Sequence, residues 1–174
     1  MNRLPQSRAR QTSSVFLRVR YLSIFSLPSP GVSRDRAKDI DLREALKGLQ
    51  EKKLKILIID DESAFRASMK ILLTKAFKAE VADVESGYDG LANVSGSNSY
   101  DIIFLDLMMP GMSGNQTYTE LIKLKSSLHV VFMSAYSSSK EWETARNSGV
   151  TLLHKPIPLE ELVRVLSQCG GVRP

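Results

Sequence analysis

Five short apolar segments alternate with five amphipathic segments over residues 53–170, and this alternation constrains the fold more than any other feature. The apolar segments are LKILIID at 54–60, AEVADVE at 79–85, DIIFLD at 101–106, LHVVFMS at 128–134 and GVTLLHK at 149–155. Each has the length of a β-strand, and helical spacing is found between or after them, at 62–76, 87–95, 114–125, 138–147 and 158–169. Strands separated by helices pair in parallel, because a parallel pair needs a crossover connection. The sequence therefore predicts an α/β fold in which helices cover both faces of a doubly wound, five-stranded parallel sheet.

The first 34 residues differ in composition from the rest of the chain. They contain six arginines and no acidic residue, whereas the remainder holds 18 basic and 19 acidic side chains. The net charge of +5 therefore belongs to this segment and does not indicate a nucleic-acid surface on the fold. Three interpretations of residues 1–34 stay open. They are a disordered basic tail, a start site assigned too far upstream, and an organellar targeting segment, for which an Arg-rich and Ser-rich composition is typical.

Residues 35–52, DRAKDIDLREALKGLQEK, are expected to form a short lead-in helix or linker before the main domain at 53–170. Ile40, Leu42 and Leu46 recur at roughly helical spacing. A dimerisation role is an alternative, but the segment covers too few heptads to predict a coiled coil.

Composition favours a soluble globular protein in a reducing compartment. Apolar residues make up 43% and charged residues 25% of the chain, close to the averages for such proteins. No segment approaches the roughly 18 consecutive apolar residues of a membrane span. The single cysteine, Cys169, cannot pair within the chain and is expected to be a packing residue. We therefore expect a cytoplasmic protein without a membrane span.

Polar side chains stand at the carboxyl ends of four of the five predicted strands. The first strand ends at Asp60 and Asp61, the third at Asp106, the fourth at Ser134 and the fifth at Lys155. The carboxyl ends of parallel strands meet at one edge of the sheet, where open α/β folds bind their ligands. A divalent cation commonly neutralises carboxylates packed this closely, and Mg²⁺ suits one or two carboxylates that share it with phosphate oxygens. The pattern therefore predicts a Mg²⁺-dependent phosphoryl-transfer site with Asp106 as the nucleophile.

Each of these features has a simpler explanation when it is considered alone. The sequence DDES before a helix is typical of an N-terminal cap, a Lys-Pro pair is typical of a turn, and a serine after a strand is also typical of a cap. Four separate strand ends with chemically compatible groups favour a site over four unrelated local motifs.

Four motifs together resemble the receiver domain of two-component response regulators. They are LIIDDE, FLDLMMPGMSG, FMSAYS and HKPIPLEELVRVL, and they follow one another at the spacing of that family. The resemblance covers about residues 53–169 and implies the family's flavodoxin-like (βα)5 fold. It is strongest for the stand-alone, chemotaxis-regulator-like single-domain type.

The resemblance also implies a metal site. It makes Asp106 the phosphoacceptor and assigns Mg²⁺ to the side chains of Asp61 and Asp106 and the backbone carbonyl of Met108. By the same resemblance, Asp60 would act on the ion largely through water.

Further roles follow from the resemblance at the later strand ends. Ser134 would donate a hydrogen bond to the phosphoryl group, Lys155 would pair with one of its oxygens, and the Lys155–Pro156 bond would be cis. Receivers often carry Tyr or Phe three residues before the lysine, but here that position is Leu152, so the usual aromatic switch is in doubt. His154 is expected to be structural or exposed.

The predicted function is that of a stand-alone receiver in phosphorelay signal transduction. It would accept a phosphoryl group from a histidine kinase or a histidine phosphotransfer protein and signal by docking on an unknown partner protein. Only five residues follow Cys169, so no output module, no direct DNA binding and no enzyme activity are expected. Trp142 lies in the segment after Ser134, where core packing and partner contact are equally compatible with the pattern.

Two alternatives come from other functional classes. A metal-dependent phosphatase of the haloacid-dehalogenase type also has an aspartyl nucleophile at a strand end, but it has a second aspartate two residues later, where this chain has Met108. A flavodoxin-like cofactor binder, or a receiver-like module that binds its partner without being phosphorylated, is the other alternative.

Overall fold

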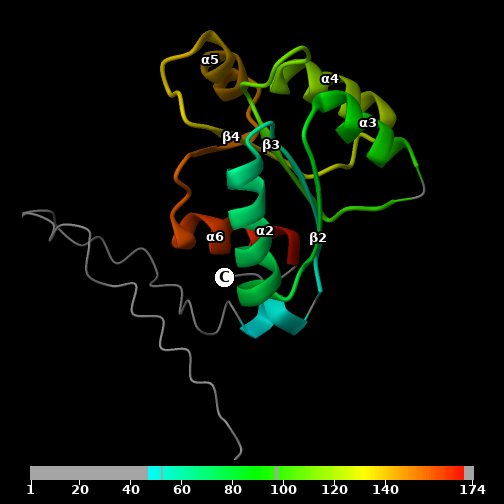
Figure 1. Cartoon of the computed structure of the whole chain (residues 1–174), viewed down its shortest axis with the longest axis vertical. Helices are drawn as coiled ribbons and strands as arrows, with labels where there is room; N and C mark the ends of the chain where they lie inside the picture. The colour runs from blue at the N-terminus through cyan, green and yellow to red at the C-terminus, as the bar shows by residue number, and fades with distance from the viewer. Residues whose placement is uncertain (1–46, 52, 97, 171–174) are drawn as a thin grey trace, which may run out of the picture. The chain divides into compact units, whose positions relative to one another are not determined.

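A computed structural model describes residues 47–51, 53–96 and 98–170. Five strands alternate with five helices along these residues (Figure 1). The elements are β1 (Lys55–Ile59), α2 (Ser63–Phe77), β2 (Glu80–Val84), α3 (Gly87–Ser95), β3 (Ile102–Asp106), α4 (Gly114–Leu124), β4 (Val130–Ser134), α5 (Lys140–Asn147), β5 (Thr151–His154) and α6 (Leu159–Gly170). Every predicted strand and helix is present, and each end lies within two residues of its predicted position.

The five strands form one parallel sheet in the order β2-β1-β3-β4-β5. Its register pairs Leu57 of β1 with Ile103 of β3, and Leu105 of β3 with Phe132 of β4. This order is that of flavodoxin-like doubly wound folds, so the predicted fold class is confirmed. Because β1 lies beside β3, the chain reverses its direction of winding there, and ligands of such folds bind at the carboxyl ends of these two strands.

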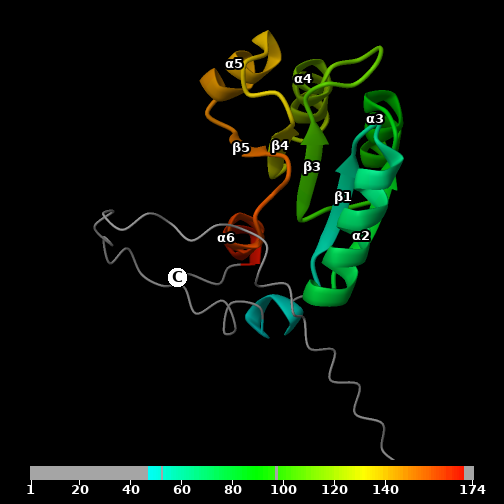
Figure 2. The same cartoon turned by 60° about the vertical axis from the view of Figure 1, so that its left-hand side comes forward.

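Two hydrophobic clusters, one on each face of the sheet, form the core. Alternate residues of a strand point to opposite faces, so Ile56 and Ile58 belong to one cluster and Leu57 and Ile59 to the other. Helices α2 and α6 cover the first face, whereas α3, α4 and α5 cover the second (Figure 2). The central strands β3 and β4 are buried along their whole length, which explains why their sequences are continuous apolar runs.

The described part of the predicted lead-in helix, residues 47–51, is helical and packs on the α2 and α6 face. Leu49 is fully buried in that cluster, and Gln50 Nε2 donates a hydrogen bond to the Ala76 carbonyl at 2.7 Å. The rest of the predicted segment at 35–52 and the basic segment at 1–34 lie outside the described residues. Among the helices that the structure describes, none is long and apolar enough to span a membrane.

Candidate functional site

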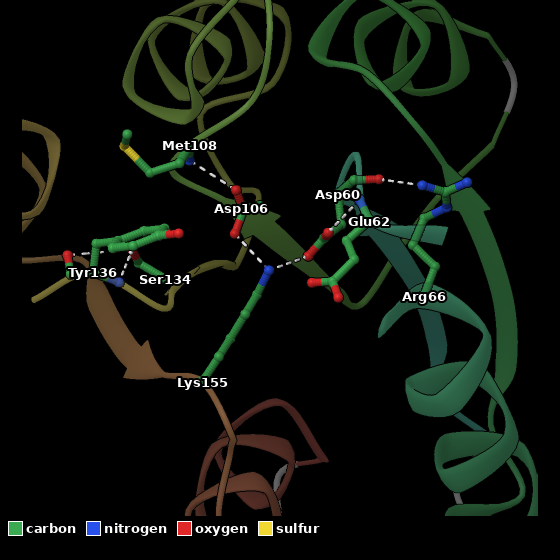
Figure 3. A network of polar contacts seen from close by, with 8 residues as sticks. All are labelled: Asp60, Glu62, Arg66, Asp106, Met108, Ser134, Tyr136 and Lys155. Atoms are coloured by element: carbon green, nitrogen blue, oxygen red, sulfur yellow. Dashed lines mark hydrogen bonds and ion pairs between the residues drawn. The ribbon is translucent and has the colours of Figure 1, made fainter. Parts of the chain in front are cut away.

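One lysine and two buried carboxylates form the centre of the site, at the carboxyl ends of β1, β3 and β5. Lys155 Nζ lies 2.6 Å from Asp60 Oδ2 and 2.6 Å from Asp106 Oδ1 (Figure 3). Asp60 and Asp106 are adjacent because β1 and β3 are neighbours in the sheet, and Lys155 reaches them from the end of β5. All three side chains are almost entirely shielded from solvent. The ammonium group therefore bridges two carboxylates in a region of low effective dielectric constant.

Burial and pairing act on these groups in opposite directions. Burial raises the pKa of Asp60 above its ordinary value of 3.8, and the charge of Asp106 adds to this, while Lys155 and the Glu62 backbone N–H partly offset it. Burial by itself would lower the pKa of Lys155, but its contacts with Asp106 and Asp60 outweigh burial and hold that pKa above 10.5. Lys155 therefore carries a full positive charge at neutral pH, and it favours the ionised form of Asp60.

Backbone N–H groups fix the two carboxylates from the opposite side. Glu62 N–H donates to Asp60 Oδ1 at 3.0 Å, and Met108 N–H donates to Asp106 Oδ2 at 2.7 Å. Each carboxylate thus has one oxygen on Lys155 and the other on the loop that follows its own strand. These contacts fix the positions of both carboxylates.

A cavity of about 330 Å³ opens beside Asp106. It is lined by Asp61, Glu62, Asp106, Met108, Ala135, Tyr136 and Lys155. Of the predicted site residues, Asp61, Asp106, Met108 and Lys155 therefore share one cavity. Asp60 is fully buried and is not part of the lining.

Ser134 is fully buried at the end of β4 and holds the loop that follows it. Its Oγ accepts a hydrogen bond from the Tyr136 N–H at 3.0 Å and donates to the Tyr136 carbonyl at 3.4 Å. The Tyr136 ring extends beside Ser134 toward Asp106 (Figure 3). Ser134 is thus near the cavity but does not line it in this conformation.

The donor atoms around the cavity fit Mg²⁺. The carboxylates of Asp61 and Asp106 and the carbonyl of Met108 are hard oxygen donors, and a cation, the Lys155 ammonium, already contacts Asp106. Within the part of the chain that the structure describes, no group of three or more His, Cys, Asp or Glu side chains could hold a metal ion by itself. An ion here would keep several water ligands, as Mg²⁺ commonly does. Asp60 is fully buried and does not line the cavity, which suits an indirect role.

The residues near β5 differ in their surroundings. Leu152 is half-buried against the α3, α4 and α5 side of the core, so an aliphatic side chain occupies the position of the usual aromatic switch. His154 is exposed, as expected, and its ring meets Trp142 edge-on with centroids 6.0 Å apart. Trp142 also packs against the core cluster, which favours the packing interpretation of this residue. The Lys155–Pro156 bond is cis, as expected.

Arg66 was not singled out from the sequence, yet it contacts the site directly. Its guanidinium donates a hydrogen bond to the Asp60 carbonyl at 2.6 Å (Figure 3). The only sequence signal is a basic residue one helical turn into α2, which is a common pattern on any solvated helix face. A side-chain contact across a loop cannot be read from such a pattern.

The fold and the site define a doubly wound α/β protein with two aspartates and a lysine at the carboxyl edge of its sheet. Comparisons with known proteins give the family. The family model described as response regulator receiver domain matches residues 56–167. The chain belongs to this family, so the predicted resemblance is confirmed. Receiver domains are parts of two-component phosphorelay systems, and they generally act as signalling modules rather than as enzymes.

Curated relatives are longer than this chain. The sensor protein GacS of Pseudomonas syringae pv. syringae is 32% identical over 125 residues, which cover 68% of this chain and 14% of GacS. The nitrate/nitrite response regulator protein NarL of Escherichia coli is 32% identical over 117 residues, which cover 67% of this chain and 54% of NarL. The match to these proteins is therefore a match to one part of each.

Several solved structures of similar fold are receiver domains. One from Clostridium thermocellum is 28% identical with a TM-score of 0.61, covering 68% of this chain and 94% of that one. The receiver domain of a sensor histidine kinase from Pseudomonas aeruginosa, with a magnesium ion coordinated in its active site cleft, has a TM-score of 0.61 at 21% identity. It covers 68% of this chain and 98% of that one, and at this identity it shows the shared fold alone.

Proposed function

We propose that Asp106 accepts a phosphoryl group from the phosphohistidine of a histidine kinase or of a histidine phosphotransfer protein. One observation carries this proposal. Among the described acidic residues, Asp106 is the one whose side chain both pairs with Lys155 and lines the cavity. A carboxylate that faces a cavity beside a positive charge is suited to attack a phosphorus atom and to have the product's charge offset.

The transfer is a displacement at phosphorus. A carboxylate oxygen of Asp106 forms the new O–P bond while the P–N bond of the donor phosphohistidine breaks, and the donor imidazole keeps the electron pair. The Lys155 ammonium can then pair with a phosphoryl oxygen, while its ion pair with Asp60 is retained. Mg²⁺, held by Asp61, Asp106 and the Met108 carbonyl, would offset charge on the phosphoryl oxygens.

The partners belong to the same proposal. Several relatives are histidine kinases, which supports a phosphohistidine protein as the donor. The phosphorylated domain would signal by docking on a further protein in the cytoplasm, rather than by contacting DNA itself.

The phosphatase alternative is less well supported by the site. It requires an acid or base two residues after the nucleophile, but Met108 occupies this position and contacts Asp106 through its backbone N–H. A methionine side chain cannot exchange a proton with a leaving group.

Intact-mass spectrometry after treatment with acetyl phosphate and Mg²⁺ tests the proposal. The unchanged protein should gain one phosphoryl group, and Asp106→Asn should gain none. Asp101→Asn is a matched control because Asp101 precedes the opposite end of β3, where its carboxylate accepts a hydrogen bond from Lys55 N–H at 2.8 Å. Phosphorylation of Asp106→Asn would overturn the assignment.

A further inference from the structure

Arg66 joins three elements behind the site. It lies in α2, its guanidinium donates to the Asp60 carbonyl at the end of β1, and its Nε lies 3.5 Å from Asp83 Oδ2 on β2. The side chain is only 12% exposed. Figure 3 shows Arg66 and Lys155 on opposite sides of Asp60, so Arg66 meets the backbone of this residue and Lys155 meets its carboxylate.

These contacts fix the peptide that leads into Asp61. Asp60 N–H donates to the Val84 carbonyl at 3.2 Å, which continues the β1–β2 ladder to the end of the strand. The Asp60 carbonyl is then held by Arg66, and the Asp60 carboxylate accepts from Glu62 N–H. The peptide between Asp60 and Asp61 is therefore restrained at its carbonyl and on both sides. The direction in which Asp61 enters the cavity follows from this restraint.

We propose that Arg66 is a positioning residue for magnesium, acting through the Asp60 carbonyl on the carboxylate of Asp61. The inference rests on the magnesium site of the proposed function. Arg66 lines a different cavity, so it would not touch the ion itself. Loss of a group that orients a metal ligand commonly weakens metal affinity by roughly 10- to 100-fold.

A positioning role and a simple electrostatic role predict opposite changes in Mg²⁺ affinity for the same substitution. Arg66 is a positive charge near an acidic site, and it disfavours a divalent cation there by repulsion. If charge were its only effect, Arg66→Gln would bind Mg²⁺ more tightly than the unchanged protein. If Arg66 positions Asp61, Arg66→Gln binds Mg²⁺ more weakly. If Arg66 contributed only to the stability of the fold, Arg66→Gln would leave the Mg²⁺ affinity unchanged.

Lys70 provides a matched control on the same helix. It lies one turn after Arg66, carries the same charge and pairs with the same carboxylate, with Nζ 2.5 Å from Asp83 Oδ1. Its side chain is 47% exposed, and its ion pair and hydrogen bond are both with Asp83. Lys70→Gln therefore removes the charge and the Asp83 contact but leaves the restraint on the Asp60 carbonyl.

The experiment measures Mg²⁺ affinity by isothermal titration calorimetry and Mn²⁺ affinity by electron paramagnetic resonance. Arg66→Gln should bind both ions roughly 10- to 100-fold more weakly, and Lys70→Gln should bind them as tightly as the unchanged protein or slightly more tightly. Arg66→Lys keeps one charged donor and should recover part of the loss. The acetyl phosphate reaction of Arg66→Gln should need more Mg²⁺ and approach the normal rate at saturation.

A folded Arg66→Gln protein that binds Mg²⁺ as tightly as the unchanged protein, or more tightly, would overturn the inference. Circular dichroism shows whether the variant folds. If it does not, Arg66→Lys provides the test, because it keeps the positive charge but lacks the planar set of donors of the guanidinium. Weaker Mg²⁺ binding by Arg66→Lys supports the inference, since the charge at this position is unchanged, and unchanged binding overturns it. Absence of Mg²⁺ binding by the unchanged protein would instead count against the proposed magnesium site.

Discussion

Replacement of Lys155 by Met should destabilise the fold by an amount that depends on pH. Lys155 is the shared partner of two buried carboxylates, each 2.6 Å from its ammonium group. Removing one partner of a buried ion pair costs about 3–5 kcal/mol, because the remaining charge is left without compensation. This is a large part of the total stability of a domain, which is about 5–15 kcal/mol. Methionine has a similar length, so the loss reports the charge more than the packing.

The direction of the pH dependence follows from Asp60. Burial already raises the pKa of this carboxyl, and the contacts with Lys155 oppose that rise. In Lys155→Met the opposition is lost, so the pKa of Asp60 should rise further. A group whose pKa is raised on folding contributes stability at low pH and loses it as the pH rises through its folded pKa. The deficit of the variant should therefore be larger at about pH 8 than at about pH 5.

Urea unfolding in EDTA, followed by the fluorescence of Trp142, measures this deficit at both pH values. The unchanged protein should show a smaller pH dependence from Asp60 than the variant, since Lys155 has a raised pKa, stays charged across the range and opposes the rise in the pKa of Asp60. The double variant Asp60→Asn with Lys155→Met replaces one of the two orphaned carboxylates by an amide and should recover part of the stability. A deficit below about 1 kcal/mol, or an equal deficit at both pH values, would refute the reasoning, because surface pairs have effects of that size.

Three further predictions concern other parts of the molecule. Met108 and Tyr136 are 41% and 63% exposed at the rim of the cavity, and neither orients a water for hydrolysis, so Met108→Asn with Tyr136→Glu should speed loss of the phosphoryl group about tenfold, measured by mass spectrometry over time. Gly114→Ala should cost about 2–3 kcal/mol in urea unfolding, since its Cβ would lie 2.2 Å from the Asp106 carbonyl oxygen, whereas Gly96→Ala, with its nearest atom at 3.6 Å, should be close to neutral. Burial lowers the pKa of His129 from 6.5, so His129 contributes stability that is present above this pH and lost as the pH falls, and His129→Asn should reduce the loss in a pH series of unfolding curves.

The order of strands and helices could be predicted because its signals are local. A buried parallel strand is a short apolar run, and a following helix shows a different period, so β3 and β4 were read directly from IIFLD and VVFMS. The ends of elements were predicted less well, since the first residues of the predicted strands at 128–134 and 149–155 belong to the preceding connections. Leu128 and Val150 are apolar, but the paired register of these strands begins only at Val130 and Thr151.

The candidate site could be predicted at the level of strand ends but not at the level of atoms. The sequence places Asp60, Asp106 and Lys155 at one sheet edge, but the bridging position of the ammonium group depends on how a long side chain crosses two strands. The simple capping interpretation of DDES finds little support in the structure. Glu62 occupies the N-cap of α2, and its side chain makes no capping hydrogen bond. The acids here are turned toward the site rather than toward the helix end. This orientation depends on the conformation of the loop and cannot be read from the motif.

Asp60 explains why a strand of the core ends in a charge that does not face the cavity. Its raised pKa shows that burial disfavours the ionised form, so this residue does not improve stability by itself. Asp60 nevertheless connects the groups that surround the site. Its carboxylate binds Lys155 and the Glu62 N–H, and its carbonyl binds Arg66. An apolar residue in its place would leave Lys155 with Asp106 as its single carboxylate partner. Asp60 thus keeps the ammonium group beside the cavity even when the charge on Asp106 is altered, which is the condition that a phosphoryl-accepting site has to meet.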